Sequence, residues 1–179
     1  MSIDPADVVT FWKEAGATRW FKRDDAFDAE FRNRFLGTHE AAAAGELAEW
    51  ADSAEGALAL LLLLDQFPRN AFRGTSRVYA TDVKAREVAD AAIRAGFDGQ
   101  TQEDLRPFFY LPFMHSERPE DQERSVALNT TVGGASLRFA LHHRDIVARF
   151  GRFPHRNEVL GRESTPEEKR FLAEGGFSG

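Results

Sequence analysis

The sequence predicts an all-α protein, and three observations support this prediction. Apolar residues recur at helical spacing, for example at Phe27, Phe31 and Phe35, which are four residues apart. Capping residues, often followed by Pro, precede several apolar segments. Strict alternation of apolar and polar residues, which indicates strands, is not sustained anywhere. We therefore expect one domain over residues 1–179, with about eight helices joined by short connections and a frayed tail at 175–179.

The N-terminal segments illustrate how the helices are expected to begin and end. Asp4 is an N-cap residue followed by Pro5, which favours a helix from there to about residue 15. The phenylalanine stripe belongs to a second helix that starts at Asp24, and its aromatic character predicts burial in the core. We expect Gly37 to interrupt this second helix.

The most apolar stretch, residues 56–64, predicts a central helix that is buried on all sides. Asp52 or Ser53 is expected to cap its start. Its end is expected at Phe67-Pro68, because Pro has no N–H to donate and restricts the residue before it. Further helices are predicted over residues 81–95, 119–132 and 136–150, and from Ser164 or Thr165 onwards. In the helix over 136–150, Phe139, Ile146 and Phe150 share one arc and are expected to face the core.

Composition and charge exclude several classes of function. The chain has a formal net charge of -6 and no cysteine, so disulfides and thiolate chemistry are absent, which suits a reducing cytoplasm. The N-terminus lacks the basic residues of a signal peptide, and the apolar run is about half the length of a membrane span, so we expect a cytoplasmic protein without membrane contact. The negative charge argues against general nucleic-acid binding. No cofactor is predicted, since phosphate-binding glycine motifs are missing.

One segment, residues 138–162, concentrates cations in this acidic chain. It contains six arginines and three of the five histidines. Gly151 and Pro154 are expected to make its turn rigid. Guanidinium groups on such a turn favour carboxylate or phosphate ligands, but they can instead bind the carbonyls that helix ends leave unpaired, and both interpretations stay open. The candidate ligand-binding residues of this segment are Arg149, Arg152, His155, Arg156, Asn157 and Arg162.

A second group of candidates follows the apolar FFYLPFM stretch. His115 and Glu117 have the residue types of an acid/base pair, since His titrates near neutrality and Glu can orient it. Their H-x-E spacing occurs in zinc deaminases, but the cysteine half of that motif cannot exist here. The adjacent His142 and His143 point about 100° apart on a helix, which is poor geometry for one metal. We predict no metal site, and the candidates for catalysis are His115, Glu117 and His155.

A third group lies at the end of the apolar central helix. Asp65 and Arg69 are four residues apart and form the obvious local ion pair, with Asn70 beside them. Charged residues at such a buried end are usually paired. These three residues either share a ligand pocket with the other motifs or form a hydrogen-bonded structural cluster. His115, Asp65, Arg69 and Asn70 complete the set of candidate ligand-binding residues.

Three motifs in the same order resemble a bacterial family called domain of unknown function 924. They are LDQFPRNAFRGTSRVYATD, FFYLPFMHSE followed by DQERSVAL, and HRDIVARFGRFPHRNEVLGRESTPEE. The resemblance runs from Phe11-Trp12 to Phe171-Leu172. It implies helix pairs stacked as in tetratricopeptide-repeat proteins and no established activity. One departure is Arg118, where the family often has an acidic residue after His-Ser-Glu. The family-typical positions are Asp65, Gln66, Pro68, Arg69 and Asn70; His115, Ser116 and Glu117; and Arg149, Gly151, Arg152, Pro154, His155, Arg156 and Asn157.

Three functions are compatible with these residues. The first is a binding protein whose Arg, His and Asn side chains take an anionic small molecule or an acidic peptide segment. The second is a hydrolase or transferase that uses His115 or His155 as general acid/base on an anionic substrate. The third is a protein interaction scaffold in which the motifs are purely structural. A homo-oligomer is compatible with all three, and we favour the first.

Overall fold

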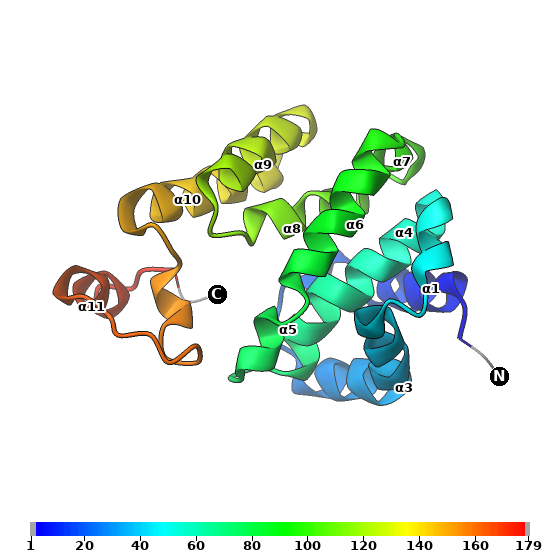
Figure 1. Ribbon diagram of the computed structural model, residues 1–179, viewed down its shortest axis with the longest axis horizontal. Helices are drawn as coiled ribbons and strands as arrows, with labels where there is room; N and C mark the ends of the chain where they lie inside the picture. Colours follow the sequence, from blue (N-terminus) through cyan, green and yellow to red (C-terminus); the bar gives the residue numbers. More distant parts are fainter. Residues whose placement is uncertain (1–2, 178–179) are drawn as a thin grey trace. The chain divides into compact units, whose positions relative to one another are not determined.

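The computed structural model describes residues 3–177, which form helices and turns without any strand, so the all-α prediction is confirmed (Figure 1). The helices labelled α1 to α11 exceed the eight expected, because several are single turns of four or five residues. The described residues fall into two compact units: unit 1 holds 3–73 and 77–112, and unit 2 holds 74–76 and 113–177. The expectation of one domain over residues 1–179 stays a prediction.

Unit 1 consists of helices joined by short turns. Asp4 caps the first helix as expected and forms a capping box with Asp7. The helices are α1 (Pro5–Ala15), α2 (Ala17–Trp20), α3 (Asp25–Ala44), α4 (Ala54–Leu61), α5 (Phe67–Ala71), α6 (Asp82–Arg94) and α7 (Phe97–Gln100), with 3-10 turns η1 (Ala48–Asp52) and η4 (Arg106–Phe109). At the boundaries between the units in the sequence lie η3 (Ser76–Tyr79) and α8 (Leu111–Met114).

The phenylalanine stripe of α3 forms part of the unit 1 core, as predicted. Phe27, Phe31 and Phe35 are buried, and the ring of Phe11 from α1 lies 5.2–5.4 Å from each of them. Gly37 does not interrupt the helix, which continues to Ala44. The packing of the stripe holds the helix together through this residue, since a single Gly costs only about 1 kcal/mol relative to Ala.

The apolar central helix does not end at Pro68, which corrects the prediction. After α4 the chain forms one π-helical turn, Leu62–Gln66, and continues directly into α5. Pro68 still supplies no N–H, but the carbonyls that an N–H there would bind have other donors. His39 Nδ1 donates to the Leu63 oxygen at 2.9 Å, and Thr81 Oγ1 donates to the Leu64 oxygen at 2.5 Å. Side chains from α3 and the start of α6 thus replace the missing backbone donor.

Replacing Thr81 with Val tests this explanation. The change keeps the side-chain shape but leaves the buried Leu64 carbonyl without its donor, so we expect the free energy of unfolding of unit 1 to fall by about 1–2 kcal/mol. Urea unfolding followed by tryptophan fluorescence measures it, because all three tryptophans lie in unit 1. The control is Thr10→Val on the exposed face of α1, which should change stability by less than about 0.5 kcal/mol.

Unit 2 is built around a pair of long helices. The helix α9 packs along α10, and Gly133, with a positive φ of 72°, turns the chain between them (Figure 1). Phe139, expected in the core, is 58% exposed instead, whereas Ile146 is buried as predicted. The helices and the 3-10 turn of unit 2 are α9 (Pro119–Val132), α10 (Gly134–Phe150), η5 (Pro154–Arg156) and α11 (Pro166–Ala173).

The C-terminal tail is packed as far as it is described. The ring centroid of Phe177 lies 4.6 Å from that of His143, and fraying from residue 175 stays a prediction. Residues 178 and 179 lie outside the described residues. Across the described chain, no helix combines the length and the apolar character that crossing a membrane requires.

Candidate functional site

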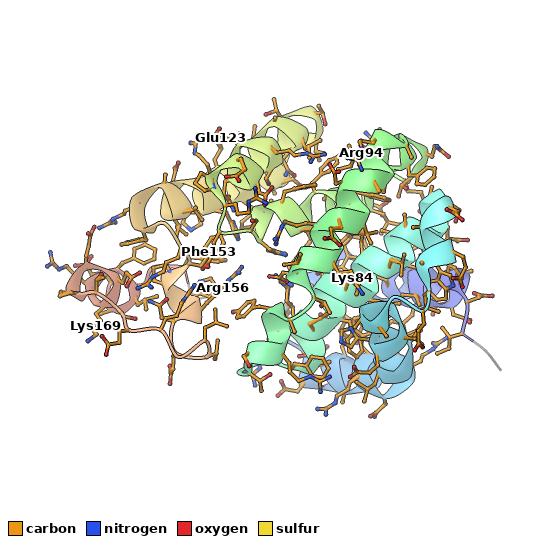
Figure 2. The ribbon with its side chains drawn as sticks, in the orientation of Figure 1. Lys84, Arg94, Glu123, Phe153, Arg156 and Lys169 are labelled. Carbon is orange, nitrogen blue, oxygen red and sulfur yellow. The ribbon has the colours of Figure 1, made fainter. Side chains whose placement is uncertain are left out.

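The FPHRN turn of unit 2, residues 153–157, is rigid because its backbone is fixed at both ends. Gly151 ends α10 in the left-handed region, with φ at 70°, and its N–H donates to the Val147 carbonyl at 2.7 Å. Phe153 is fully buried and Pro154 opens the short turn η5. Figure 2 shows Phe153 and Arg156 on this segment between α10 and α11. The side chains of the turn therefore start from a fixed support.

Glu117 and Arg162 form the first of two ion pairs around the turn. Arg162 donates two parallel hydrogen bonds to the Glu117 carboxylate, at 2.7 and 2.9 Å, and the Phe153 N–H donates a third at 2.8 Å. Burial raises the pKa of Glu117, but the hydrogen bonds from Arg162 and Phe153 and the charge of Arg162 outweigh it, so this pKa lies below its ordinary value. Glu117 is thus a carboxylate whose two oxygens are engaged by Arg162 and by the backbone of the turn.

Glu168, the other ion-pair carboxylate, is buried in α11. Arg152 donates to its two oxygens at 2.7 and 2.9 Å, and Asn157 Nδ2 lies 3.3 Å from the second oxygen. The same oxygen accepts the Thr165 N–H at 2.7 Å and closes the capping box that starts α11. The hydrogen bonds from Arg152 are the main cause that lowers the pKa of Glu168 to about 2, against the opposing effect of burial.

Arg156, His155 and His115 form a third group at the turn. Arg156 Nη2 donates to the His115 carbonyl at 2.8 Å, and its guanidinium carbon lies 4.5 Å from the centre of the Phe153 ring. His155 is partly buried, and its Nδ1 atom is buried without a hydrogen-bond partner among the described residues. Burial is the largest cause that lowers the pKa of His155 to about 4, so this imidazole is neutral at pH 7.

Arginines outnumber glutamates among the side chains described above. Arg152, Arg156 and Arg162 contribute three positive charges, and Glu117 and Glu168 contribute two negative ones, so this set carries one net positive charge. His143 adds no charge at pH 7, because burial lowers its pKa to about 3. Arg149, by contrast, is exposed on α10 and pairs with exposed Glu167. In the described chain, no group of three or more His, Asp or Glu residues is arranged to hold a metal ion.

The candidates of the FPRN turn, residues 67–70, form a separate cluster inside unit 1. Arg69 donates to the Asp65 carbonyl at 2.7 Å and to the Asp82 carboxylate at 3.0 Å, and lies 3.2 Å from the Asp65 carboxylate. Asn70 donates to Asp28 at 2.6 Å. The guanidinium of Arg69 is thus engaged by carboxylates of its own unit.

The structure thus brings one part of the candidate set together in unit 2. That part consists of His115, Glu117, Arg152, His155, Arg156, Asn157 and Arg162, whereas Asp65, Arg69 and Asn70 lie in unit 1. Sequence reasoning missed Glu168 as a partner of the turn. Its place three residues after Thr165 in a capping box was the available signal. It also missed His143, whose one available signal was its position in the helix expected over residues 136–150.

Fold and site define a class: an all-α protein whose proline turn is held by two partly buried arginine–glutamate pairs. The chain belongs to the family described as "Bacterial protein of unknown function (DUF924)", whose model matches residues 8–176. The resemblance to this family is therefore confirmed. A solved structure, "Structure of Protein of Unknown Function ATU0120 from Agrobacterium tumefaciens", is 58% identical over 96% of this chain and 97% of that chain, with a TM-score of 0.94. A comparison with curated proteins gave no match.

Proposed function

We propose that this protein binds a small carboxylate- or phosphate-bearing molecule, or an acidic peptide segment, at the FPHRN turn of unit 2. One observation carries the proposal: a guanidinium held in place by Phe153 and the His115 carbonyl stands beside an imidazole whose buried Nδ1 has no hydrogen-bond partner within residues 3–177. A guanidinium binds carboxylate and phosphate strongly, and an imidazole nitrogen adds a directional hydrogen bond. Arg156 and His155 are the proposed recognition residues.

The two arginines that flank the turn, Arg152 and Arg162, are assigned a structural role in this proposal. Arg152 and Arg162 each bind a glutamate through two hydrogen bonds, and these bonds connect α11 and the 115–117 segment to the turn. An anionic ligand would have to displace these internal carboxylates, which are already held in good geometry. The same pairs make the turn rigid, and rigidity lowers the entropic cost of binding.

The low pKa of the His155 imidazole favours a binding function over general acid/base catalysis. A general base works best when its pKa is near the working pH, and the pKa of His155 is about 4. The tetratricopeptide-like stacking and the cytoplasmic location expected from the sequence remain predictions. The interaction scaffold is the outcome if no anion binds.

Replacing Arg156 with Gln tests the proposal. Isothermal titration with phosphate and with succinate at low salt should show binding to the natural protein that weakens about 10–100-fold in the variant, since a hydrogen bond to a charged group is worth about 1.5–3 kcal/mol. Added salt should weaken binding in both.

Arg149→Gln is the matched control, because Arg149 is also an arginine near the end of α10 but is exposed and paired with Glu167. Its dissociation constants should stay within about twofold of the natural values. Identical constants for the Arg156 variant and the natural protein would overturn the proposal. A lowered thermal midpoint with no anion binding in either protein would favour a structural role for the turn.

A further inference from the structure

The ring of Phe177 lies against three imidazoles of unit 2. Its centroid is 4.6 Å from that of His143, 5.1 Å from that of His155 and 5.6 Å from that of His142, with interplanar angles of 65–82°. These edge-to-face contacts are the favoured geometry for aromatic pairs. We call His142, His143 and His155 the histidine cage. A side chain from the C-terminal tail therefore occupies a site formed by α10 and the FPHRN turn.

The tail reaches the histidine cage through two glycines. The helix α11 ends at Ala173, Gly175 then adopts a left-handed φ of 83°, and the Gly176 N–H donates to the Phe171 carbonyl at 2.9 Å. A Cβ atom on Gly176 would lie 2.5 Å from that carbonyl oxygen, so only glycine follows this path. In the described part of the tail this is the last hydrogen bond, and the Phe177 ring provides the contacts beyond it.

The Phe177 ring does not satisfy all the polar groups around it. His143 Nδ1 donates to the Phe139 carbonyl at 2.8 Å, but the buried His155 Nδ1 has no hydrogen-bond partner in the part of the chain that the structure describes. A phenyl ring fills space and offers no strong donor or acceptor. A ligand that combined an aromatic ring with a polar group would satisfy both the cage and this nitrogen, so the tail should be displaceable.

The cage and the guanidinium of Arg156 share one neighbour. The Phe153 ring lies 5.6 Å from the His143 ring and 5.7 Å from the His155 ring, and Arg156 stands 4.5 Å from its centre. A molecule with a ring and an acid on a short linker can therefore contact both. We propose that Phe177 is a built-in occupant of the histidine cage and that the external ligand is an aromatic acid, whose ring displaces Phe177 while its anionic group meets Arg156. The anionic half of this inference rests on the proposed function, whereas the cage half does not.

The test uses the full chain and 3-phenylpropionate as the probe. Two control compounds are propionate, which lacks the ring, and 3-phenylpropanamide, which lacks the charge. In the natural protein only molecules whose tail has left the cage can bind the probe, so the apparent affinity is the intrinsic affinity multiplied by the fraction of such molecules. Phe177→Ala should therefore bind 3-phenylpropionate about tenfold more tightly or better, as measured by isothermal titration. Propionate affinity should not change, and the amide should bind the variant more weakly than the acid.

A second variant keeps the ring and disturbs only the path of the tail. Gly176→Ala should tighten 3-phenylpropionate binding as Phe177→Ala does, whereas Gly37→Ala, where a Cβ meets nothing within 4 Å, should not. If both tail variants bind 3-phenylpropionate with the same affinity as the natural protein, the proposal that Phe177 occupies the ligand's place in the cage is overturned, whether or not the protein binds phosphate. If the amide instead binds Phe177→Ala as tightly as the acid, and adding Arg156→Gln changes nothing, the cage is supported but the anionic half and the proposed function both fail.

Discussion

Replacing Glu168 with Gln is expected to lower the free energy of unfolding of unit 2 by about 3 kcal/mol at pH 7. The buried carboxylate accepts two hydrogen bonds from Arg152 and one from the Thr165 N–H that starts α11. An amide turns one of these acceptors into a donor and leaves a largely buried guanidinium without its charge partner, and breaking such pairs costs about 3–5 kcal/mol. Urea unfolding followed by circular dichroism at 222 nm measures the change.

The pH dependence of this effect has a definite sign. The pKa of Glu168 is about 2 in the folded protein, below its ordinary value of 4.5, so folding favours the ionised form. The stabilisation by the carboxylate is fully present above about pH 4.5 and is lost as the pH falls toward 2. The difference in stability between the natural protein and Glu168→Gln should therefore shrink over this window, from about 3 kcal/mol to near zero.

Glu167→Gln is the matched control, one residue earlier on the same helix. Glu167 is 58% exposed and pairs with Arg149, which is 54% exposed, so its replacement should cost less than about 0.5 kcal/mol. Hydrogen exchange of the amides in α11 assigns any loss to unit 2. Similar losses for the two variants would contradict the importance given to the buried pair.

Local sequence rules predicted most of the fold. The stripe of Phe27, Phe31 and Phe35 and the caps at Asp4 and Thr165 lie where period and capping chemistry place them. Such features depend on neighbours within four residues, so the sequence contains the whole interaction. Phe139 was expected in the core but is exposed, because its burial depends on which face of α10 meets α9.

Pro68 shows why local rules fail elsewhere. A helix without that N–H is unstable in isolation, and the prediction that it ends there is locally sound. The donors that allow it to continue come from His39 and Thr81, which are 24 and 17 residues away from the carbonyls they bind. No local pattern specifies such partners.

The candidate site likewise has features that local sequence rules predict and contacts that they do not. The rigid turn after α10 could be predicted from Gly151 and Pro154, and the cation cluster from composition. The partners of the cations could not, because Glu117 lies 45 residues from Arg162. Whether a cluster of arginines recruits an anion or is neutralised internally depends on these distant partners.

The Arg69 cluster of unit 1 provides the second large effect. The side chain of Arg69 is 18% exposed and contacts two carboxylates that are almost fully buried, those of Asp65 and Asp82. Arg73 is the natural comparison, since it is 40% exposed and binds one carboxylate, that of Asp28. The two arginines are four residues apart and differ mainly in how far the ion pair is removed from water.

Replacing Arg69 with Met should lower the free energy of unfolding of unit 1 by about 3–4 kcal/mol, because it removes a guanidinium that contacts two nearly buried carboxylates. Arg73→Met should cost about 1 kcal/mol, since water screens its pair more strongly. Urea unfolding followed by tryptophan fluorescence at pH 7 measures both. Equal losses would contradict the idea that burial sets the contribution of these pairs, whereas a large loss for Arg69 alone would assign the FPRN turn a structural role in unit 1.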